Sequence, residues 1–272
     1  MNKRSDGKMT RWILMLFLIV TMFITPVVQA MPSNVLDRNQ LEKYFEGYNG
    51  TFILLDEQND EYTVYNEIQS EKRISPCSSY KIYNSLIGLE TGVIKDESTV
   101  IKWDGIIYPL KSWDKDNTLA SAISNSVIWY YKELASRVGK DRMQEYINKI
   151  PYGNCDISGG ATFWQVSSLK ISAQEQVELL KRLYNDQLPF SQRNMGIVRK
   201  IITLTNKDGV TFSGKTGTGI KEGNDIIGWF VGCVEKDGKK YFFATNIEAI
   251  DNANGMKAKQ ISMSILKDMG LL

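Results

Sequence analysis

Short β-type runs, rich in hydrophobic and β-branched residues, lie near both ends of the chain and predict β-strands there. Residues 51–56 and 61–65 are two such runs, and the polar stretch between them predicts a hairpin. Three further runs predict strands in the last third of the chain, at residues 210–216, 225–234 and 239–247. The last two are joined by Lys236, Asp237 and Gly238, a strong signal for a tight turn.

Helical spacing dominates the middle of the chain. Residues 119–138, 142–150 and 172–185 have this spacing, and the third segment opens with a capping box from Ser172 to Glu175. The tail, residues 254–269, is a further amphipathic helix whose apolar side can lie against a sheet. The pattern predicts an α+β fold with an antiparallel sheet of five to seven strands, flanked by terminal helices. An all-helical lobe, roughly residues 95–205, is inserted, and a cleft is expected where the lobes meet.

The first thirty residues are expected to stand apart from this domain. A basic start is followed by an apolar run at residues 12–24, by Pro26 and by a small-residue cleavage site after Ala30. This is the pattern of a signal peptide, so residues 31–272 form the single mature domain, in a secreted or extracytoplasmic protein. The alternative is a leader that is not cleaved and holds the chain at a membrane, although the run is short for a span of about 20 residues.

Composition narrows the possible chemistry. The chain of 272 residues has 33 Lys and Arg, 31 Asp and Glu, and no His. Without imidazole, a Ser-His-Asp triad and a His-ligated metal are both excluded, so the catalytic base must be Lys, a carboxylate, Tyr or Cys. The near-neutral charge balance argues against nucleic acid as a partner, and the absence of His argues against a metal. Membrane contact is expected only through the leader.

The three cysteines do not form a disulfide framework. Cys77, Cys155 and Cys233 are an odd number and are spaced 78 residues apart. Free thiols are therefore expected.

The first chemical motif is a serine followed three residues later by a lysine. Ser78 and Lys81 lie at the start of a helical stretch and so share one face. At a helix amino terminus, free N–H groups favour a developing oxyanion at Ser78. Lys81 lies one turn inward and can serve as the base that His does not supply. Cys77 is one position short of this face. Alone, the motif is also compatible with a capped helix and a solvated lysine.

Two further motifs follow in order. Ser126 and Ile128 lie within the first central helical segment, where a lone serine usually makes only a local hydrogen bond. Lys215, Thr216 and Gly217 come at the end of a predicted strand, where flanking glycines allow a substrate backbone to approach closely.

Together these motifs resemble the class D serine β-lactamases of the penicillin-recognising superfamily. The resemblance runs from about Gly50 to the carboxyl end and includes further motifs at Tyr152 to Asn154, Phe163 and Trp164, and Gly228 to Gly232. Class A enzymes are less similar, because they require Ser-Asp-Asn at the second motif. The resemblance implies the β-lactamase/transpeptidase-like fold and hydrolysis of penicillin-type antibiotics through a serine acyl-enzyme, conferring resistance.

The resemblance also implies a role for each matched residue. Ser78 is the nucleophile, and Lys81 is the general base after carbon dioxide converts it to N6-carboxylysine; no other cofactor is implied. Only a neutral amine adds to carbon dioxide, and burial in an apolar pocket favours that form. Trp164 is expected to hold the carbamate through its indole N–H.

The resemblance implies that the remaining matched residues bind the substrate or act on it. Ser126, with Lys215 beside it, passes a proton to the leaving lactam nitrogen. The N–H groups of Ser78 and Thr218 form the oxyanion hole. Substrate-binding residues are also implied, namely Ile128, Thr216, Gly217, Thr218 and Lys257, with a loop at Tyr152 to Asn154 bordering the cleft.

Three departures from the family pattern stand out. Ile128 replaces the usual Val, and Tyr80 replaces the commoner Phe, as it does in β-lactam sensor domains. The usual Arg that binds the substrate carboxylate is missing, which leaves Lys257 or Lys259, with Lys257 preferred.

Two alternative functions are a sensor domain that is acylated but does not hydrolyse the acyl group, and a penicillin-binding peptidase that acts on peptidoglycan. We expect the enzyme, because the sequence shows one leader segment and not several membrane spans.

Overall fold

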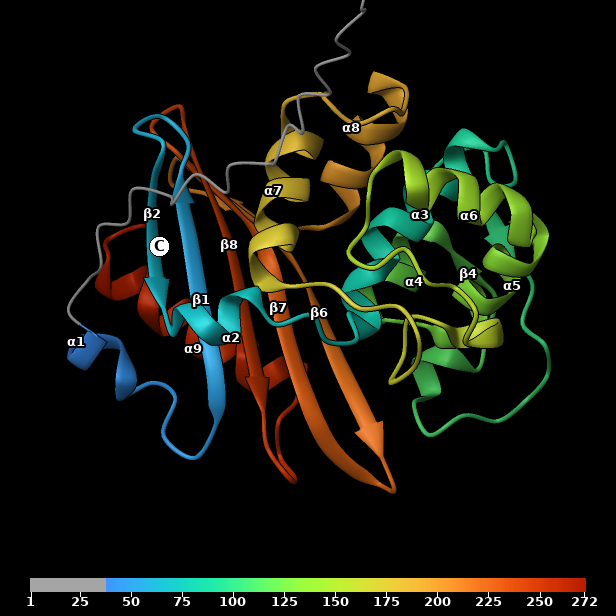
Figure 1. Ribbon diagram of the computed structural model, residues 1–272. Helices are drawn as coiled ribbons and strands as arrows, with labels where there is room; N and C mark the ends of the chain where they lie inside the picture. Colours follow the sequence, from blue (N-terminus) through green and yellow to red (C-terminus); the bar gives the residue numbers. More distant parts are fainter. Residues whose placement is uncertain (1–37) are drawn as a thin grey trace, which may run out of the picture. The chain divides into compact units, whose positions relative to one another are not determined.

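The computed structural model describes residues 38–272; the predicted leader lies outside the described residues. A six-stranded antiparallel sheet has the order β2-β1-β8-β7-β6-β5 (Figure 1). The strands are β1 (Asn49–Asp56), β2 (Glu61–Tyr65), β5 (Thr203–Lys207), β6 (Val210–Lys221), β7 (Asn224–Lys236) and β8 (Lys239–Glu248). Both ends of the described chain thus contribute to one sheet, as the sequence pattern predicted.

The two predicted turns are confirmed. Residues 57–60 connect β1 to β2, and Asp237 and Gly238 connect β7 to β8 with φ angles of 52° and 74°. A two-residue loop with positive φ at both positions matches the twist of an antiparallel pair. The sequence pattern did not reveal β5, because four of its five residues are exposed at the sheet edge and it has no apolar alternation.

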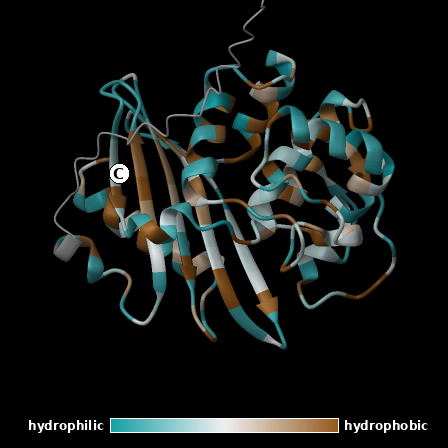
Figure 2. Cartoon of the chain, in the orientation of Figure 1, coloured by the Kyte–Doolittle hydropathy of each residue, from teal (hydrophilic) through white to brown (hydrophobic). Residues whose placement is uncertain are grey.

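The sheet is buried on both faces. Along β7, Trp229, Val231 and Cys233 enter one core, whereas Phe230 and Val234 enter the other, as the two-residue period of a strand requires. Figure 2 shows the resulting hydrophobic colouring along the strands. The first core continues into the helices, and the second lies under α9 (Gly255–Asp268) and the short α1 (Arg38–Glu42).

The other helices form the helical part of the domain or cover the sheet. They are α2 (Glu67–Glu71), α3 (Lys81–Glu90), α4 (Leu119–Ser124), α5 (Ile128–Val138), α6 (Lys140–Lys149), α7 (Ala173–Tyr184) and α8 (Gln192–Ile201). Three 3-10 turns, η1 (Cys77–Tyr80), η2 (Lys111–Trp113) and η3 (Gly160–Thr162), and a small ribbon of β3 (Val100–Ile101) and β4 (Asn117–Thr118) complete the described elements. Nine of the ten residues of α3 are buried, so this helix is the centre of the helical core.

The predicted helix at residues 119–138 is wrong as a single element. It is two helices, α4 and α5, separated at residues 125–127, where Ser126 has a φ of 57°. The apolar spacing continues across the break, which hid it from periodicity. Ser126 is therefore not a helix serine but lies in a turn between two helices.

The capping box at Ser172 is confirmed: its side chain accepts a hydrogen bond from the Glu175 N–H, and Glu175 accepts one from the Ser172 N–H. The helix that it opens, α7, packs against β1 and β8 and covers the sheet, although it lies within the range predicted for the lobe. Conversely, α3 begins before that range. The helical lobe is thus less continuous in sequence than predicted.

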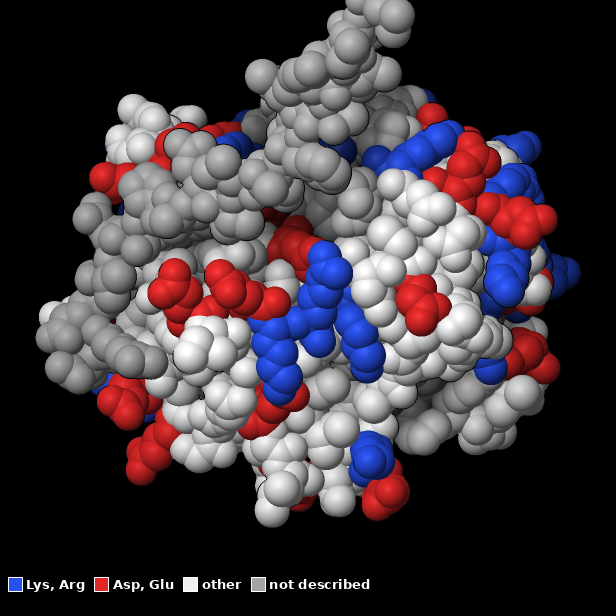
Figure 3. All heavy atoms as spheres, viewed as in Figure 1, with Lys and Arg blue, Asp and Glu red and all other residues white. Residues whose placement is uncertain are grey.

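The described surface carries both charges. On the face shown in Figure 3, Lys and Arg side chains lie among Asp and Glu side chains. In residues 38–272, no helix is long and apolar enough to cross a membrane. Over the same residues, no group of Cys, Asp and Glu side chains could hold a metal ion. The three cysteines are free, as expected.

Candidate active site

The serine motif begins in a tight turn in front of a buried helix. Cys77 has a φ of 51°, which redirects the chain after Pro76 into the turn η1. The Ser79 hydroxyl donates to the Pro76 carbonyl at 2.8 Å and accepts from Gln176 Nε2 at 2.8 Å, so the turn is anchored to α7. Ser78 is 8% exposed and can therefore be reached from solvent at the edge of the core.

Lys81, the first residue of α3, is fully buried beside this serine. Its Nζ lies 2.7 Å from the Ser78 Oγ. Desolvation, and second the positive charge of Lys215, hold the pKa of Lys81 well below its usual value. Burial therefore favours the neutral form of the amine, which can accept the proton of the Ser78 hydroxyl, as a base must.

Ser126 connects two lysines. Its Oγ lies 3.0 Å from Lys81 Nζ and 3.0 Å from Lys215 Nζ, while its carbonyl accepts from Lys81 at 2.9 Å. Lys215 is 5% exposed, and burial, followed by the charge of Lys259, lowers its pKa to about 7. The positive φ of Ser126 turns its side chain and its carbonyl toward the same amine, which a continuing helix would not allow.

Glycine at position 217 permits close approach of β6 to the nucleophile. A Cβ added there would lie 2.8 Å from the Pro76 carbonyl oxygen and 3.2 Å from the Ser78 nitrogen. The predicted oxyanion pair, the N–H groups of Ser78 and Thr218, is thus carried by two segments in contact. The Thr218 hydroxyl accepts from the Gly255 N–H at 2.9 Å and so joins the strand to the start of α9. Thr216 is half-buried, and its Oγ1 lies 3.4 Å from Lys215 Nζ.

Trp164 is fully buried, and its indole Nε1 has no hydrogen-bond partner among the described residues. Its ring stacks on Tyr80 with 5.7 Å between centroids, and Tyr80 directly precedes Lys81. A buried donor without a partner is costly, and an acceptor on a bound or covalently attached group would satisfy it. The Trp164 site therefore fits a carboxylated Lys81.

The segment from Tyr152 to Asn154 differs from expectation. Tyr152 is fully buried and packs edge-on against Tyr80, with 5.3 Å between centroids. Asn154 Oδ1 accepts from the Lys170 N–H at 2.9 Å, and Asn154 Nδ2 donates to the Ser168 carbonyl at 2.9 Å. Tyr152 is therefore a core residue and does not border the cleft, while Asn154 fixes the loop that follows Trp164.

The structure places the two lysines of α9 in different surroundings. Lys257 Nζ lies 6.0 Å from the centre of the Tyr48 ring, whereas Lys259 lines a pocket of about 160 Å³ together with Lys215 and Thr216. The sequence could not distinguish them, because both lie near the start of one helix and only the helix position decides which side chain faces β6. Binding of a carboxylate stays a prediction, and it moves from Lys257 to Lys259.

Two aromatic residues near the site were not predicted. The Tyr131 ring lies 5.5 Å from Lys81 Nζ, and its hydroxyl lies 2.9 Å from the Ser85 Oγ. Trp113 donates from its indole to the Asn125 carbonyl at 2.9 Å and so supports the turn that carries Ser126. Tyr131 follows Ser126 by five residues, a spacing that carries no signal unless the helix break is known. Ile128, the first residue of α5, is half-buried.

Cys77 is not a competing nucleophile. Its thiol is fully buried, and desolvation raises its pKa to about 12. A thiol that stays protonated is a weak nucleophile. The structure thus assembles one activated hydroxyl with two amines and a second hydroxyl, a set suited to acyl transfer.

Comparison with known proteins finds similarity to proteins that are named for penicillin binding or β-lactam resistance. Residues 50–267 match the penicillin binding protein transpeptidase domain. The methicillin resistance protein MecR1 of Staphylococcus aureus is 44% identical over 234 residues, 86% of this chain but only 40% of MecR1. The chain thus spans less than half the length of that relative.

Two solved structures match this chain over nearly their own whole length. A class D β-lactamase from Bacillus subtilis superposes with a TM-score of 0.81 and 40% identity, covering 87% of this chain and 99% of the other. The carboxyl-terminal domain of the Bacillus licheniformis BlaR penicillin-receptor superposes with a TM-score of 0.85 and 36% identity, covering 90% and 99%. The predicted fold class is confirmed.

Burial of Lys215 in its neutral form predicts a stability that depends on pH. Its pKa is about 7 in the folded chain and 10.5 for an exposed lysine, so the unfolded chain binds the extra proton between these values. The free energy of unfolding should therefore rise with pH over this window, by up to about 1.4 kcal/mol per pH unit. Urea titrations from pH 6 to 10 should show a smaller slope for Lys215→Met than for the natural protein. The exposed control Lys95→Met should keep the slope, and an unchanged slope in Lys215→Met would contradict a neutral Lys215.

Proposed function

The chain belongs to the penicillin-binding protein transpeptidase domain family, and on this premise we propose that it is a class D-type serine β-lactamase that hydrolyses penicillins. The observation that carries the proposal is the buried amine of Lys81, whose pKa is held well below its usual value, 2.7 Å from the Ser78 hydroxyl. The site does not require a peptidoglycan peptide as its substrate. The strained amide of a β-lactam ring, which acylates one serine, is sufficient.

Acylation follows from the geometry of the hydroxyls and amines. Ser78 loses its proton to the base at Lys81, and its Oγ forms a bond to the lactam carbonyl carbon. The N–H groups of Ser78 and Thr218 stabilise the oxyanion. When the carbon–nitrogen bond breaks, the nitrogen takes a proton from the Ser126 hydroxyl. Because the Ser126 Oγ lies 3.0 Å from Lys81 Nζ, the proton that Lys81 took from Ser78 can pass on to Ser126.

Hydrolysis of the ester requires a base for water, and we propose that carbon dioxide supplies it by carboxylating Lys81. The modified side chain would then be a carboxylate that takes a proton from serine or from water. Trp164 would hold it through the indole N–H that otherwise has no partner. The neutral state of Lys81 is the condition for this modification, since a protonated amine has no lone pair to add to carbon dioxide. No other cofactor is proposed.

The proposed site for the substrate carboxylate is the pocket that Lys259 and Lys215 share. The Lys259 ammonium group would attract an anion, and Thr216 adds a hydroxyl at the same wall. A bound carboxylate would also favour the charged form of Lys215, whose pKa is about 7 without it. We further propose that residues 1–30 act as a signal peptide, so that the domain works outside the cytoplasm and protects the cell from β-lactams.

A penicillin receptor is the second candidate. The likeness to the BlaR domain, with a TM-score of 0.85, favours it. The resemblance drawn from the sequence adds Tyr80, which it implies is common to sensor domains. Such a receptor would form the same acyl-serine and keep it. The two functions therefore differ in one measurable step, the release of the acyl group.

Turnover distinguishes the two functions. We expect continuous hydrolysis of a chromogenic cephalosporin and only a transient adduct by intact mass. Ser78→Ala should form no adduct, and Lys81→Ala should retain any adduct that forms, because the base for deacylation is lost. A single stoichiometric burst with a permanent adduct would refute hydrolysis and leave the receptor.

Removal of the Trp164 donor should make activity depend on added bicarbonate. In Trp164→Phe the carbamate loses its hydrogen bond, so it should dissociate more readily, above all after acid treatment. Bicarbonate should restore the rate of this variant, measured as steady-state hydrolysis at fixed pH. Trp103→Phe removes an indole donor from an exposed loop, where the partner is the Ile106 carbonyl, and should show no such dependence. Equal responses in the two variants would argue against carboxylation at Lys81.

A paired comparison tests the carboxylate site. Lys259→Gln should raise KM for a penicillin about tenfold, the effect of losing one charge-assisted hydrogen bond. Lys257→Gln makes the same change of charge on the same helix and should leave KM unchanged. If Lys257→Gln alone raises KM, the carboxylate lies at the position first inferred from the sequence.

A further inference from the structure

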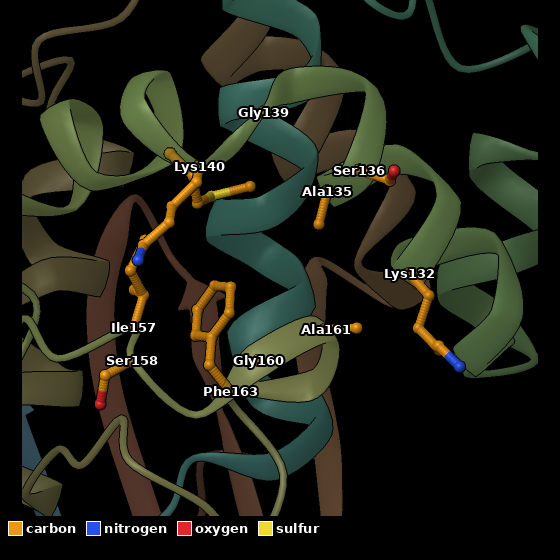
Figure 4. A pocket seen from close by; sticks show the side chains of 11 residues that line it. Lys132, Ala135, Ser136, Gly139, Lys140, Ile157, Ser158, Gly160, Ala161 and Phe163 are labelled. Atoms are coloured by element: carbon orange, nitrogen blue, oxygen red, sulfur yellow. The ribbon is translucent and has the colours of Figure 1, made fainter.

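A second pocket lies apart from the catalytic residues, between α5, α6 and the turn η3 (Figure 4). Its volume is about 360 Å³, within the range of roughly 300–1,000 Å³ that small-molecule sites occupy. None of Ser78, Lys81, Ser126 and Lys215 lines it. The β-lactam chemistry proposed above therefore does not explain this pocket.

The interior of the pocket is apolar. Met143, Ile157 and Phe163 are nearly fully buried and form its floor, and Ala135 and Ala161 add methyl groups. In Figure 4, Phe163 and Ala135 extend toward a shared space. Such a surface gains free energy when a hydrocarbon or aromatic group covers it.

The rim of the pocket is cationic. Its charged lining residues are two exposed lysines, Lys132 and Lys140, and no Asp or Glu lines it. Neither lysine forms an ion pair within the part of the chain that the structure describes. Figure 4 shows Lys140 running along the edge toward Ile157 and Ser158, with Lys132 at the opposite side. The nearby Asp156 carboxylate accepts from the Ser158 N–H at 2.8 Å.

We propose that this pocket binds a small amphipathic anion, such as a medium-chain carboxylate, with its tail on Phe163 and Met143 and its head at Lys140. An apolar floor with an unpaired cation at the rim matches a ligand that has one apolar body and one negative end. A cationic amphiphile would bring like charges together, and a neutral one would leave the ammonium group unpaired.

The pocket floor also contacts the aromatic residues beside Lys81. The Tyr80 hydroxyl donates to the Met143 sulfur at 3.0 Å, and the Phe163 ring lies edge-on to Tyr80 and Trp164, at 5.4 Å and 5.0 Å. A ligand on Met143 and Phe163 is therefore one side chain away from Tyr80 and Trp164. The proposal concerns binding and does not rest on the proposed function.

Calorimetric titration of the protein with decanoate tests the proposal. We expect one saturable site per chain, with decyltrimethylammonium binding at least about tenfold more weakly, the cost of losing one charge-assisted contact. Equal binding of the two amphiphiles, or no saturable binding of decanoate, would overturn the proposal.

Three variants locate the site. Ala135→Phe fills the pocket from α5 and should abolish decanoate binding. Lys140→Glu reverses the charge at the rim and should weaken binding about tenfold or more. An acidic residue is favourable at the first position of α6, so this variant should fold even if Ala135→Phe does not. Lys95→Glu makes the same charge change at an exposed position outside the pocket and should bind like the natural protein. Decanoate binding that is unchanged in folded Lys140→Glu would place the ligand elsewhere and refute the site.

Discussion

The burial of two lysines around one pair of serines is the constraint on which the rest of the site depends. An amine in a low-dielectric interior stays neutral or needs an acid beside it, and within residues 38–272 no carboxylate forms a hydrogen bond or ion pair with Lys81 or Lys215. The interior instead supplies hydroxyls and carbonyl oxygens as partners. The same desolvation that would make a charged lysine costly thus creates a base in a protein without histidine.

The surrounding fold brings these groups together from three distant segments. Helix α3 supplies Lys81, the break between α4 and α5 supplies Ser126, and strand β6, next to the edge strand β5, supplies Lys215. The close approach of β6 to the serine turn requires Gly217, since a side chain there would collide with the Pro76 carbonyl. The packing of β6 in the sheet therefore also determines the position of the nucleophile.

Local patterns in the sequence predicted much of this arrangement. The central strands, the two turns, the capping box of α7 and the amphipathic tail are encoded by residues close together in the chain, so their patterns are readable. The motifs at Ser78, Lys81 and Lys215 are also local. What escaped prediction depends on tertiary contacts: the exposed edge strand β5, the break at Ser126, the burial of Tyr152, and the choice between Lys257 and Lys259. In each case the residue types suit more than one environment, and only packing against a distant segment selects one.

The indole of Trp113 holds the carbonyl of Asn125, and the carbonyl of Trp113 in turn accepts from the indole of Trp129. The loop that ends at Trp113 is therefore tied to the turn that carries Ser126, the residue proposed to donate a proton to the leaving nitrogen. Grafting this loop from a homologue to change substrate range would disturb proton delivery as well as the shape of the entrance, unless both indole contacts were transplanted with it. Selectivity and rate are thus mechanically linked here, and laboratory evolution of one should be expected to alter the other.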